Sequence, residues 1–158
     1  MKYVVGVGDM KVGTAADLIV THGLGSCLGI AVHDPASHVG GLLHVMMPMS
    51  ELNPAKAAVN PYMFVDTGVP EFFRQIYAVG GVKSRLVVKV AGGANTQGAN
   101  GDHFAIGKRN YIILKKMFWK NGILIDGEDV GGSIARTMYL DINAGRVWLN
   151  IAGDDKEL

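Results

Sequence analysis

This sequence has a single cysteine, no long apolar run and almost no net charge, and each of these features excludes some functions. The single cysteine among 158 residues, Cys27, can form neither an internal disulfide nor a thiolate-rich metal site. A net charge of +1 gives no electrostatic basis for binding nucleic acid or an anionic membrane. No stretch approaches membrane-spanning length, and the apolar N-terminal segment is too short for the core of a signal peptide. We therefore expect a cytoplasmic protein that inserts into no membrane.

Glycine and hydrophobic residues are abundant instead, and they indicate buried strands joined by tight turns. The chain has 22 glycines and is 49% hydrophobic. Short β-branched and apolar runs predict strands at residues 3–7, 18–21, 28–33, 39–47, 85–90, 123–125, 137–142 and 146–151. Helices are predicted to begin at Asn60-Pro61, to restart or kink at Pro70 after a turn over residues 66–69, and to cover residues 108–120. These elements predict one α+β domain over residues 1–158, with layered, largely antiparallel or mixed sheets flanked by two or three helices.

Cys27 is the first candidate for chemistry because of the segment that leads to it. Gly23 and Gly25 precede it, so the backbone can turn sharply and direct its amides at a bound group, as a nucleophile loop requires. Free cysteines, however, are most often small buried hydrophobes. For Cys27 considered alone, a packing role is therefore favoured over a catalytic role. A base close to the thiol would favour the catalytic role instead.

His44 is such a base if the chain forms the expected hairpin. A turn signal over residues 34–37 separates two apolar runs, which predicts antiparallel strands. The numbers of paired residues then sum to about 71 to 73, which places His44 opposite Cys27 or Gly29. An odd sum puts Cys27 and His44 on the same face, whereas an even sum separates them and removes the pairing.

An imidazole beside a thiol is chemically useful. As an imidazolium it lowers the thiol pKa, and it can later give its proton to a leaving amine. Thr21 ends the preceding strand-like run, so its hydroxyl or carbonyl is placed to hold the second ring nitrogen of His44, and no aspartate or asparagine is as well placed. Spacing alone favours a simpler role for Thr21, that of a β-branched residue at a strand end.

Several motifs in one order resemble a known family, the chemoreceptor glutamine deamidases CheD of bacterial chemotaxis. The resemblance is carried first by Thr21, Leu24–Cys27 and His44–Pro48. Further matches through the chain are Phe64–Thr67, Lys89–Ala94, Ile106–Asn110 and Glu128–Gly132, followed by Arg136.

The resemblance implies a catalytic triad and a reaction. The positions that match the family's catalytic residues are Cys27, His44 and Thr21. The family converts selected glutamine side chains of methyl-accepting chemotaxis receptors into glutamates and releases ammonia. It needs no cofactor, and the scattered histidines of this chain show no zinc-type spacing, so we expect no metal. Some members are also held by the phosphatase CheC, which makes CheC a possible partner.

The expected chemistry is acyl transfer. The Cys27 thiolate attacks the carboxamide carbon, and the oxyanion that forms needs hydrogen-bond donors. The turn that includes Gly25 and Ser26 is the candidate, with the amides of Ser26 and Cys27 as donors. His44 protonates the departing ammonia and then activates the water that hydrolyses the thioester.

Two segments are candidates for the rim of the substrate site, namely Met46 with Met47, and Gly92 with Gly93. Methionines at a site mouth can form an adaptable apolar platform, but they equally often fill gaps in a core. The glycine-rich segment 92–101 forms either a wall or lid of the site or an ordinary surface loop. Here it contains the polar run 95–97 where the family usually continues with an apolar residue.

Two other functions stay open at this stage. The same three residues would serve another cysteine amidase or a protease. Alternatively, the domain could be a docking or regulatory module that binds a CheC-type phosphatase or a receptor with little catalysis, in which case Cys27 should be buried and unreactive.

Overall fold

The computed structural model describes residues 1–98 and 105–158, and this part of the chain confirms an α+β fold. Its strands are β1 (Lys2–Val5), β2 (Asp9–Thr14), β3 (Leu18–Leu24), β4 (Leu28–Asp34), β5 (Val39–Val45), β6 (Val87–Gly92), β7 (Gly127–Val130), β8 (Arg136–Asp141), β9 (Arg146–Ile151) and β10 (Asp154–Glu157). Its α-helices are α1 (Pro54–Val59), α2 (Val65–Ala78) and α3 (Ile106–Lys120).

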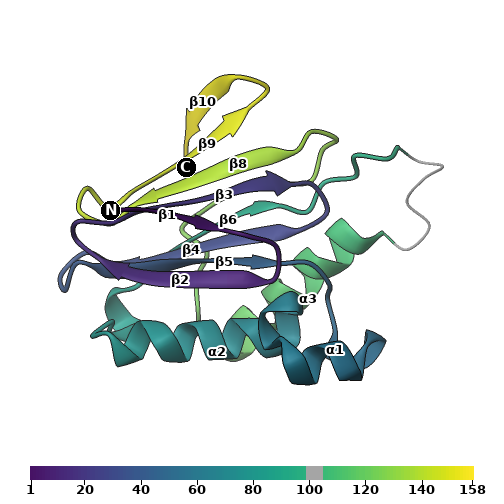
Figure 1. Cartoon of the computed structure of the whole chain (residues 1–158), viewed down its shortest axis with the longest axis horizontal. Helices are drawn as coiled ribbons and strands as arrows, with labels where there is room; N and C mark the ends of the chain where they lie inside the picture. The colour runs from purple at the N-terminus through teal and green to yellow at the C-terminus, as the bar shows by residue number, and fades with distance from the viewer. Residues whose placement is uncertain (99–104) are drawn as a thin grey trace.

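The strands form two mixed sheets of five strands each. Sheet A has the order β1-β3-β8-β9-β10, and sheet B has the order β2-β5-β4-β6-β7. In each sheet one edge pair is parallel, β1 with β3 and β6 with β7, while the other pairs are antiparallel. The sheets stack on each other and the helices lie on the outer side of sheet B (Figure 1).

The layers enclose two apolar cores on the two faces of sheet B. Side chains alternate between the faces of a strand. In β4, Leu28, Ile30 and Val32 pack toward α2 and α3, whereas Ala31 packs between the sheets with Leu42 of β5. The same alternation directs His44, two residues after Leu42, into the layer between the sheets.

Helix α2 corrects the prediction around Pro70. The helix runs unbroken over Val65–Ala78, so residues 66–69, predicted as a turn, are helical, and the predicted restart at Pro70 is wrong. A proline removes one backbone hydrogen bond, but burial of an apolar face that includes Phe72 and Phe73 outweighs that loss. The start signal at Asn60-Pro61 produces a single 3-10 turn, in which the Asn60 side chain accepts a hydrogen bond from the Tyr62 amide.

Other elements also differ from the prediction. Residues 123–125 form no strand, and the strand in this region is β7, four residues further on in the chain. Ile123 and Ile125 instead pack against the core between sheet B and the helices. Strands β2 and β10 and helix α1 were not predicted.

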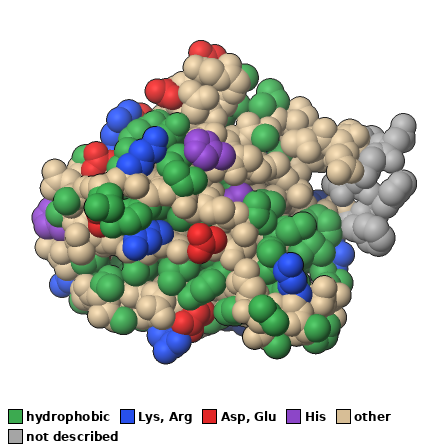
Figure 2. All heavy atoms as spheres, viewed as in Figure 1, with side chains coloured by type: hydrophobic (Ala, Val, Ile, Leu, Met, Phe, Trp, Pro, Cys, Tyr) green, Lys and Arg blue, Asp and Glu red, His purple; other side chains and the backbone are tan. Residues whose placement is uncertain are grey.

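The described surface shows no concentration of one charge on the face seen in Figure 2, where acidic and basic side chains are interspersed. In the described residues no helix is long and apolar enough to cross a membrane.

Candidate active site

Cys27 lies in the short connection between β3 and β4, at one end of the layer between the sheets. The Gly93 amide donates to the Cys27 carbonyl (2.9 Å), and the Ala94 amide donates to the Gly25 carbonyl (2.8 Å). Gly92 permits this close approach, because a Cβ there would lie 2.1 Å from the Cys27 carbonyl oxygen and its φ is +109°. The segment after β6 therefore holds the turn through its backbone, and Cys27 itself is half-buried.

His44 is positioned by the register of sheet B. It pairs with Gly29 of β4 and with Asp9 of β2. The pair numbers in the hairpin sum to 73, which is odd and within the predicted range. Cys27 precedes Gly29 by two residues, so the alternation of side chains places it on the face that carries His44. Only glycine fits at position 29 on this face, because the Leu24 side chain occupies the space. A Cβ at Gly29 would lie 2.8 Å from a Leu24 methyl group.

Thr21 fixes the orientation and the tautomer of His44. Its Oγ1 lies 2.7 Å from His44 Nδ1, and Thr21 is fully buried. The same hydroxyl donates to the Val5 carbonyl, also at 2.7 Å. A hydroxyl has one proton to donate, and the Val5 carbonyl can only accept. The hydrogen in the Thr21–His44 bond therefore comes from Nδ1, which leaves Nε2 as the unprotonated, basic nitrogen.

Burial favours the neutral forms of both the thiol and the imidazole. Burial lowers the pKa of His44 to about 4. Burial also raises the pKa of the Cys27 thiol, although the backbone N–H of Cys27 itself acts in the opposite direction. Within the described residues His44 Nε2 is buried and has no hydrogen-bond partner. Burial thus acts against an imidazolium–thiolate pair, and the arrangement suits proton transfer during attack on a substrate.

The turn before β4 offers amide donors next to the thiol. Throughout residues 1–98 and 105–158, neither the Ser26 nor the Cys27 N–H has a backbone acceptor. The Gly25 N–H, in contrast, donates to the Gly23 carbonyl (2.9 Å), so Gly25 shapes the turn and is not itself a free donor.

The predicted rim residues occupy different places. Met46 is 42% exposed, whereas Met47 is half-buried. Gly92 lies beneath the Cys27 carbonyl, and Gly93 lines a cavity of about 420 Å³ that Lys108 also borders.

The segment after Gly93 comes close to the Cys27 turn. A Cβ on Gly25 would lie 3.4 Å from the Thr96 methyl group, and the Asn95 amide donates to the Gly132 carbonyl (2.9 Å). The end of the predicted loop, residues 99–101, and His103 lie outside the described residues.

Two supporting residues had no role assigned from the sequence. Arg136 is buried and donates to Asp129 (2.9 Å) and to the carbonyls of Gly92 (3.2 Å) and Gly131 (2.7 Å). It thereby fixes the segment on which the Cys27 turn rests.

The second supporting residue is Asn110 of α3, which is fully buried and donates to the Ser26 and Met46 carbonyls. Both supporting residues belong to motifs that carry the family resemblance. The additional signal for Asn110 is a polar residue on a helix face otherwise formed by Gly107, Leu114 and Phe118.

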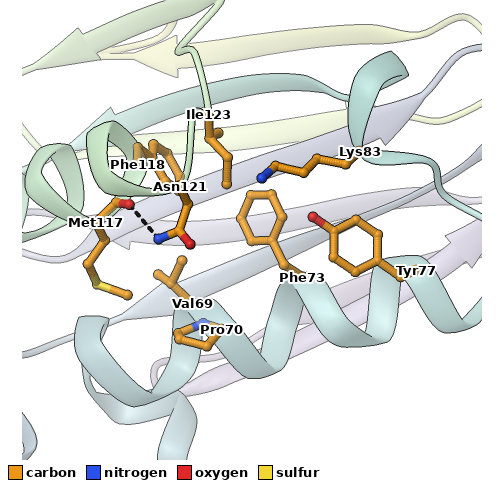
Figure 3. Close-up of a pocket in the computed structure, with 9 residues that line it drawn as sticks. All are labelled: Val69, Pro70, Phe73, Tyr77, Lys83, Met117, Phe118, Asn121 and Ile123. Atoms are coloured by element: carbon orange, nitrogen blue, oxygen red, sulfur yellow. Dashed lines mark hydrogen bonds between the residues drawn. The ribbon is translucent and has the colours of Figure 1, made fainter.

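A separate pocket of about 490 Å³ lies between α2 and α3 (Figure 3). It lies against the face of sheet B opposite to the one that carries His44. It is lined by Val69, Pro70, Phe73, Tyr77, Lys83, Met117, Phe118, Asn121 and Ile123. Most of these side chains are apolar and none is a cysteine, serine or histidine, so this pocket does not supply the chemistry of the corner formed by Thr21, Cys27 and His44.

For metals, the described residues contain no group of three or more His, Cys, Asp or Glu side chains placed to hold an ion.

Comparison with known proteins relates the chain to one family. The family model described as CheD chemotactic sensory transduction matches residues 46–151. The probable chemoreceptor glutamine deamidase CheD of Solibacter usitatus is 46% identical over 156 residues, which is 98% of this chain and 92% of that protein. CheD 1 of Syntrophus aciditrophicus is 44% identical over 151 residues, covering 95% of this chain and 94% of that protein. CheD of Pyrococcus abyssi is 40% identical over 144 residues, covering 90% and 87%.

Proposed function

This chain belongs to the CheD family, and from that premise we propose that it deamidates glutamine side chains of chemoreceptors through a thioester on Cys27. Cys27 is the nucleophile, His44 the general base and acid, and Thr21 the residue that orients His44. The product is a glutamate side chain, and ammonia leaves.

The observation that carries the proposal is the hydrogen-bonded chain from the Val5 carbonyl through Thr21 to His44 Nδ1, with both bonds at 2.7 Å. These two hydrogen bonds orient the imidazole and leave Nε2 basic, on the face of the sheet that also carries Cys27. Such an orienting partner for a base beside a nucleophile is the general requirement for this type of catalysis.

The neutral resting pair defines the order of proton movements. As Cys27 Sγ attacks the carboxamide carbon, its proton passes to His44 Nε2 and the carbonyl oxygen becomes an oxyanion. The Ser26 and Cys27 amides, which have no backbone acceptor in the described residues, then stabilise this oxyanion. The Nε2 proton then passes to the leaving nitrogen, so that ammonia departs and a thioester remains.

Hydrolysis of the thioester uses the same groups in reverse. His44 Nε2 accepts a proton from water, whose oxygen attacks the thioester carbon. Collapse of the second oxyanion breaks the carbon–sulfur bond and returns the proton from His44 to Cys27. Glutamine and water have then been converted to glutamate and ammonia, and the enzyme is restored.

The partial exposure of Cys27 supports this function over a purely docking role, for which a buried thiol was expected. The exposed Met46 side chain beside the His44 strand supports its assignment to the rim. A CheC-type phosphatase as a partner stays a prediction of the resemblance, and the cytoplasmic location stays a prediction from the sequence.

The decisive experiment is mass spectrometry of a receptor cytoplasmic fragment incubated with the wild-type protein and with Cys27→Ala. We expect a mass increase that corresponds to glutamine-to-glutamate conversion at specific sites with the wild type, and none with Cys27→Ala. Conversion by a folded Cys27→Ala protein would refute the covalent route.

Two further arms separate the rival functions. Cleavage of the fragment backbone by the wild type, without deamidation, would indicate a protease. Binding of the fragment without any change in mass, together with a Cys27 thiol that does not react with iodoacetamide, would indicate a docking module.

A further inference from the structure

Asn110 lies where α3 comes closest to the end of sheet B. One turn earlier, a Cβ on Gly107 would lie 2.6 Å from the Gly93 backbone, so the start of the helix is packed directly against the segment that supports Cys27. Asn110 is fully buried on the same face of the helix. A buried carboxamide is costly unless its polar groups are paired, so its partners explain its position.

Those partners are carbonyl groups from two different segments. Asn110 Nδ2 donates to the Ser26 carbonyl and to the Met46 carbonyl, each at 3.0 Å. Because two acceptors require two donors, the amide orientation of Asn110 is fixed by its partners. Within the described residues its Oδ1 is buried without a partner, so the side chain makes its polar contacts entirely through Nδ2.

The Ser26 carbonyl belongs to the same peptide group as the Cys27 N–H. In a planar trans peptide these two groups point in opposite directions, so holding the carbonyl toward α3 directs the N–H away from it. The Cys27 N–H belongs to the same residue as the reacting sulfur, and it acts to lower the pKa of that thiol. It has no backbone acceptor in the described part of the chain.

From these contacts we propose that Asn110 is a positioning residue that holds the Ser26–Cys27 peptide, so that the Cys27 N–H is directed at the oxyanion of the bound carboxamide. This inference rests on the proposed function and deepens it. The bond to Met46 anchors the same carboxamide to the segment that follows the His44 strand.

The other members of the site have their own supports. His44 is held by strand pairing and by Thr21, and the Cys27 carbonyl is held by the Gly93 amide. Loss of the Asn110 contacts should therefore disturb the oxyanion donor more than the thiol or its base.

Asn110→Asp tests this with a side chain of nearly the same size. A carboxyl at this buried position has one O–H donor when protonated and none when ionised, so it cannot hold both carbonyls and the peptide should rotate. We expect kcat for deamidation of the receptor fragment to fall by about 10²-fold with KM unchanged, as for a misplacement of about 1 Å. Asn121→Asp is the matched control, because Asn121 also donates to a backbone carbonyl of α3, that of Met117 at 2.7 Å, but is exposed and far along the helix.

Alkylation of Cys27 by iodoacetamide separates positioning from general damage. This reaction displaces iodide at a saturated carbon and forms no oxyanion. Its rate at high pH, where the thiol is ionised, should therefore be the same in wild type, Asn110→Asp and Asn121→Asp. The pH profile should move upward only in Asn110→Asp, because the Cys27 N–H that lowers the pKa of the thiol turns away. An equal loss of alkylation and deamidation would show that Asn110 supports the whole corner and would overturn the proposal. A wild-type kcat in Asn110→Asp would also overturn it.

Nuclear magnetic resonance tests the proposal without relying on turnover, and two Asn110 variants are compared so that the result does not depend on either one alone. The amide proton and nitrogen resonances of Cys27 should shift in Asn110→Asp and in Asn110→Ala, and remain in place in Asn121→Asp. Absence of wild-type deamidation would refute the proposed function, and the Cys27 resonance would still decide the role of Asn110. Unmoved Cys27 resonances in both Asn110 variants would overturn the inference whatever the activity.

Discussion

The corner formed by Thr21, Cys27 and His44 and the pocket between α2 and α3 lie against opposite faces of sheet B, and they are built in opposite ways. The corner is organised by strand register and by hydrogen bonds of 2.7 Å, and it contains a basic nitrogen for which the described residues supply no partner. The pocket encloses about 490 Å³ between largely apolar side chains.

This difference shows that a sizeable cavity and a reactive geometry are separate properties of the fold. A cavity between helices reflects how large side chains pack, as with Phe73 and Phe118, whose rings meet edge to face at 5.7 Å. Reactivity depends on which atoms are left unsatisfied and in which direction they point. Substitutions in the two regions should therefore have opposite consequences for activity and for stability.

Among substitutions in the corner, removal of the base should lower activity the most. We expect His44→Ala to lower kcat for deamidation by roughly 10²- to 10⁴-fold, the usual contribution of general acid and base catalysis. His22→Ala is the matched control, because His22 is exposed on β3 directly after Thr21. Steady-state kinetics on the receptor fragment provide the measurement, and a loss below tenfold for His44→Ala would exclude it as the base.

Removing the orienting hydroxyl should have a smaller effect. Thr21→Val keeps the shape but leaves His44 Nδ1 and the Val5 carbonyl without their partner, so we expect kcat to fall by about 10- to 100-fold, as for other residues that orient a functional side chain. The buried groups left unpaired should also lower the free energy of unfolding by about 1–3 kcal/mol. Denaturant unfolding and kinetics would be compared with Thr137→Val, whose hydroxyl instead lies near His22. Unchanged kcat in Thr21→Val would contradict an orienting role.

The corner was the more predictable of the two regions because its key pairing is local. In the hairpin of β4 and β5, the Asp34 side chain accepts hydrogen bonds from the amides of Ala36 (2.9 Å) and Ser37 (3.2 Å), so the turn is encoded in adjacent residues. That turn sets the register, and the register places His44 on the face of Cys27.

Elements that depend on distant partners were less predictable. All four residues of β10 are exposed and charged, and they form a strand only by pairing with β9. Helix α2 continues through Pro70 because its apolar face is buried on sheet B, which local propensity does not reveal. The contacts of Asn110 join residues that are 84 and 64 positions away in the sequence, so its partners emerge only in the folded chain.

The α2–α3 pocket offers the opposite test, with a large effect on stability and the smallest effect on activity. Phe73 is 5% exposed and contacts the rings of Phe72 and Phe118. Its replacement in Phe73→Ala should cost about 3–5 kcal/mol of unfolding free energy and lower the melting temperature by roughly 6–20 °C. Measured well below that temperature, kcat per folded molecule should match the wild type. Tyr77→Phe removes only a hydroxyl from the same pocket and should change neither quantity.

A fall in kcat for Phe73→Ala comparable to that of Thr21→Val would show that the two faces of sheet B are coupled. The coupling would have to pass through sheet B or through α3, since Asn110 lies on the same buried face of that helix as Phe118, which Phe73 contacts. Repeating the Cys27 alkylation measurement on Phe73→Ala would distinguish these routes. A shift of α3 should lower deamidation while leaving alkylation intact, because it would act on the oxyanion donor, whereas distortion of the sheet would displace His44 and lower both.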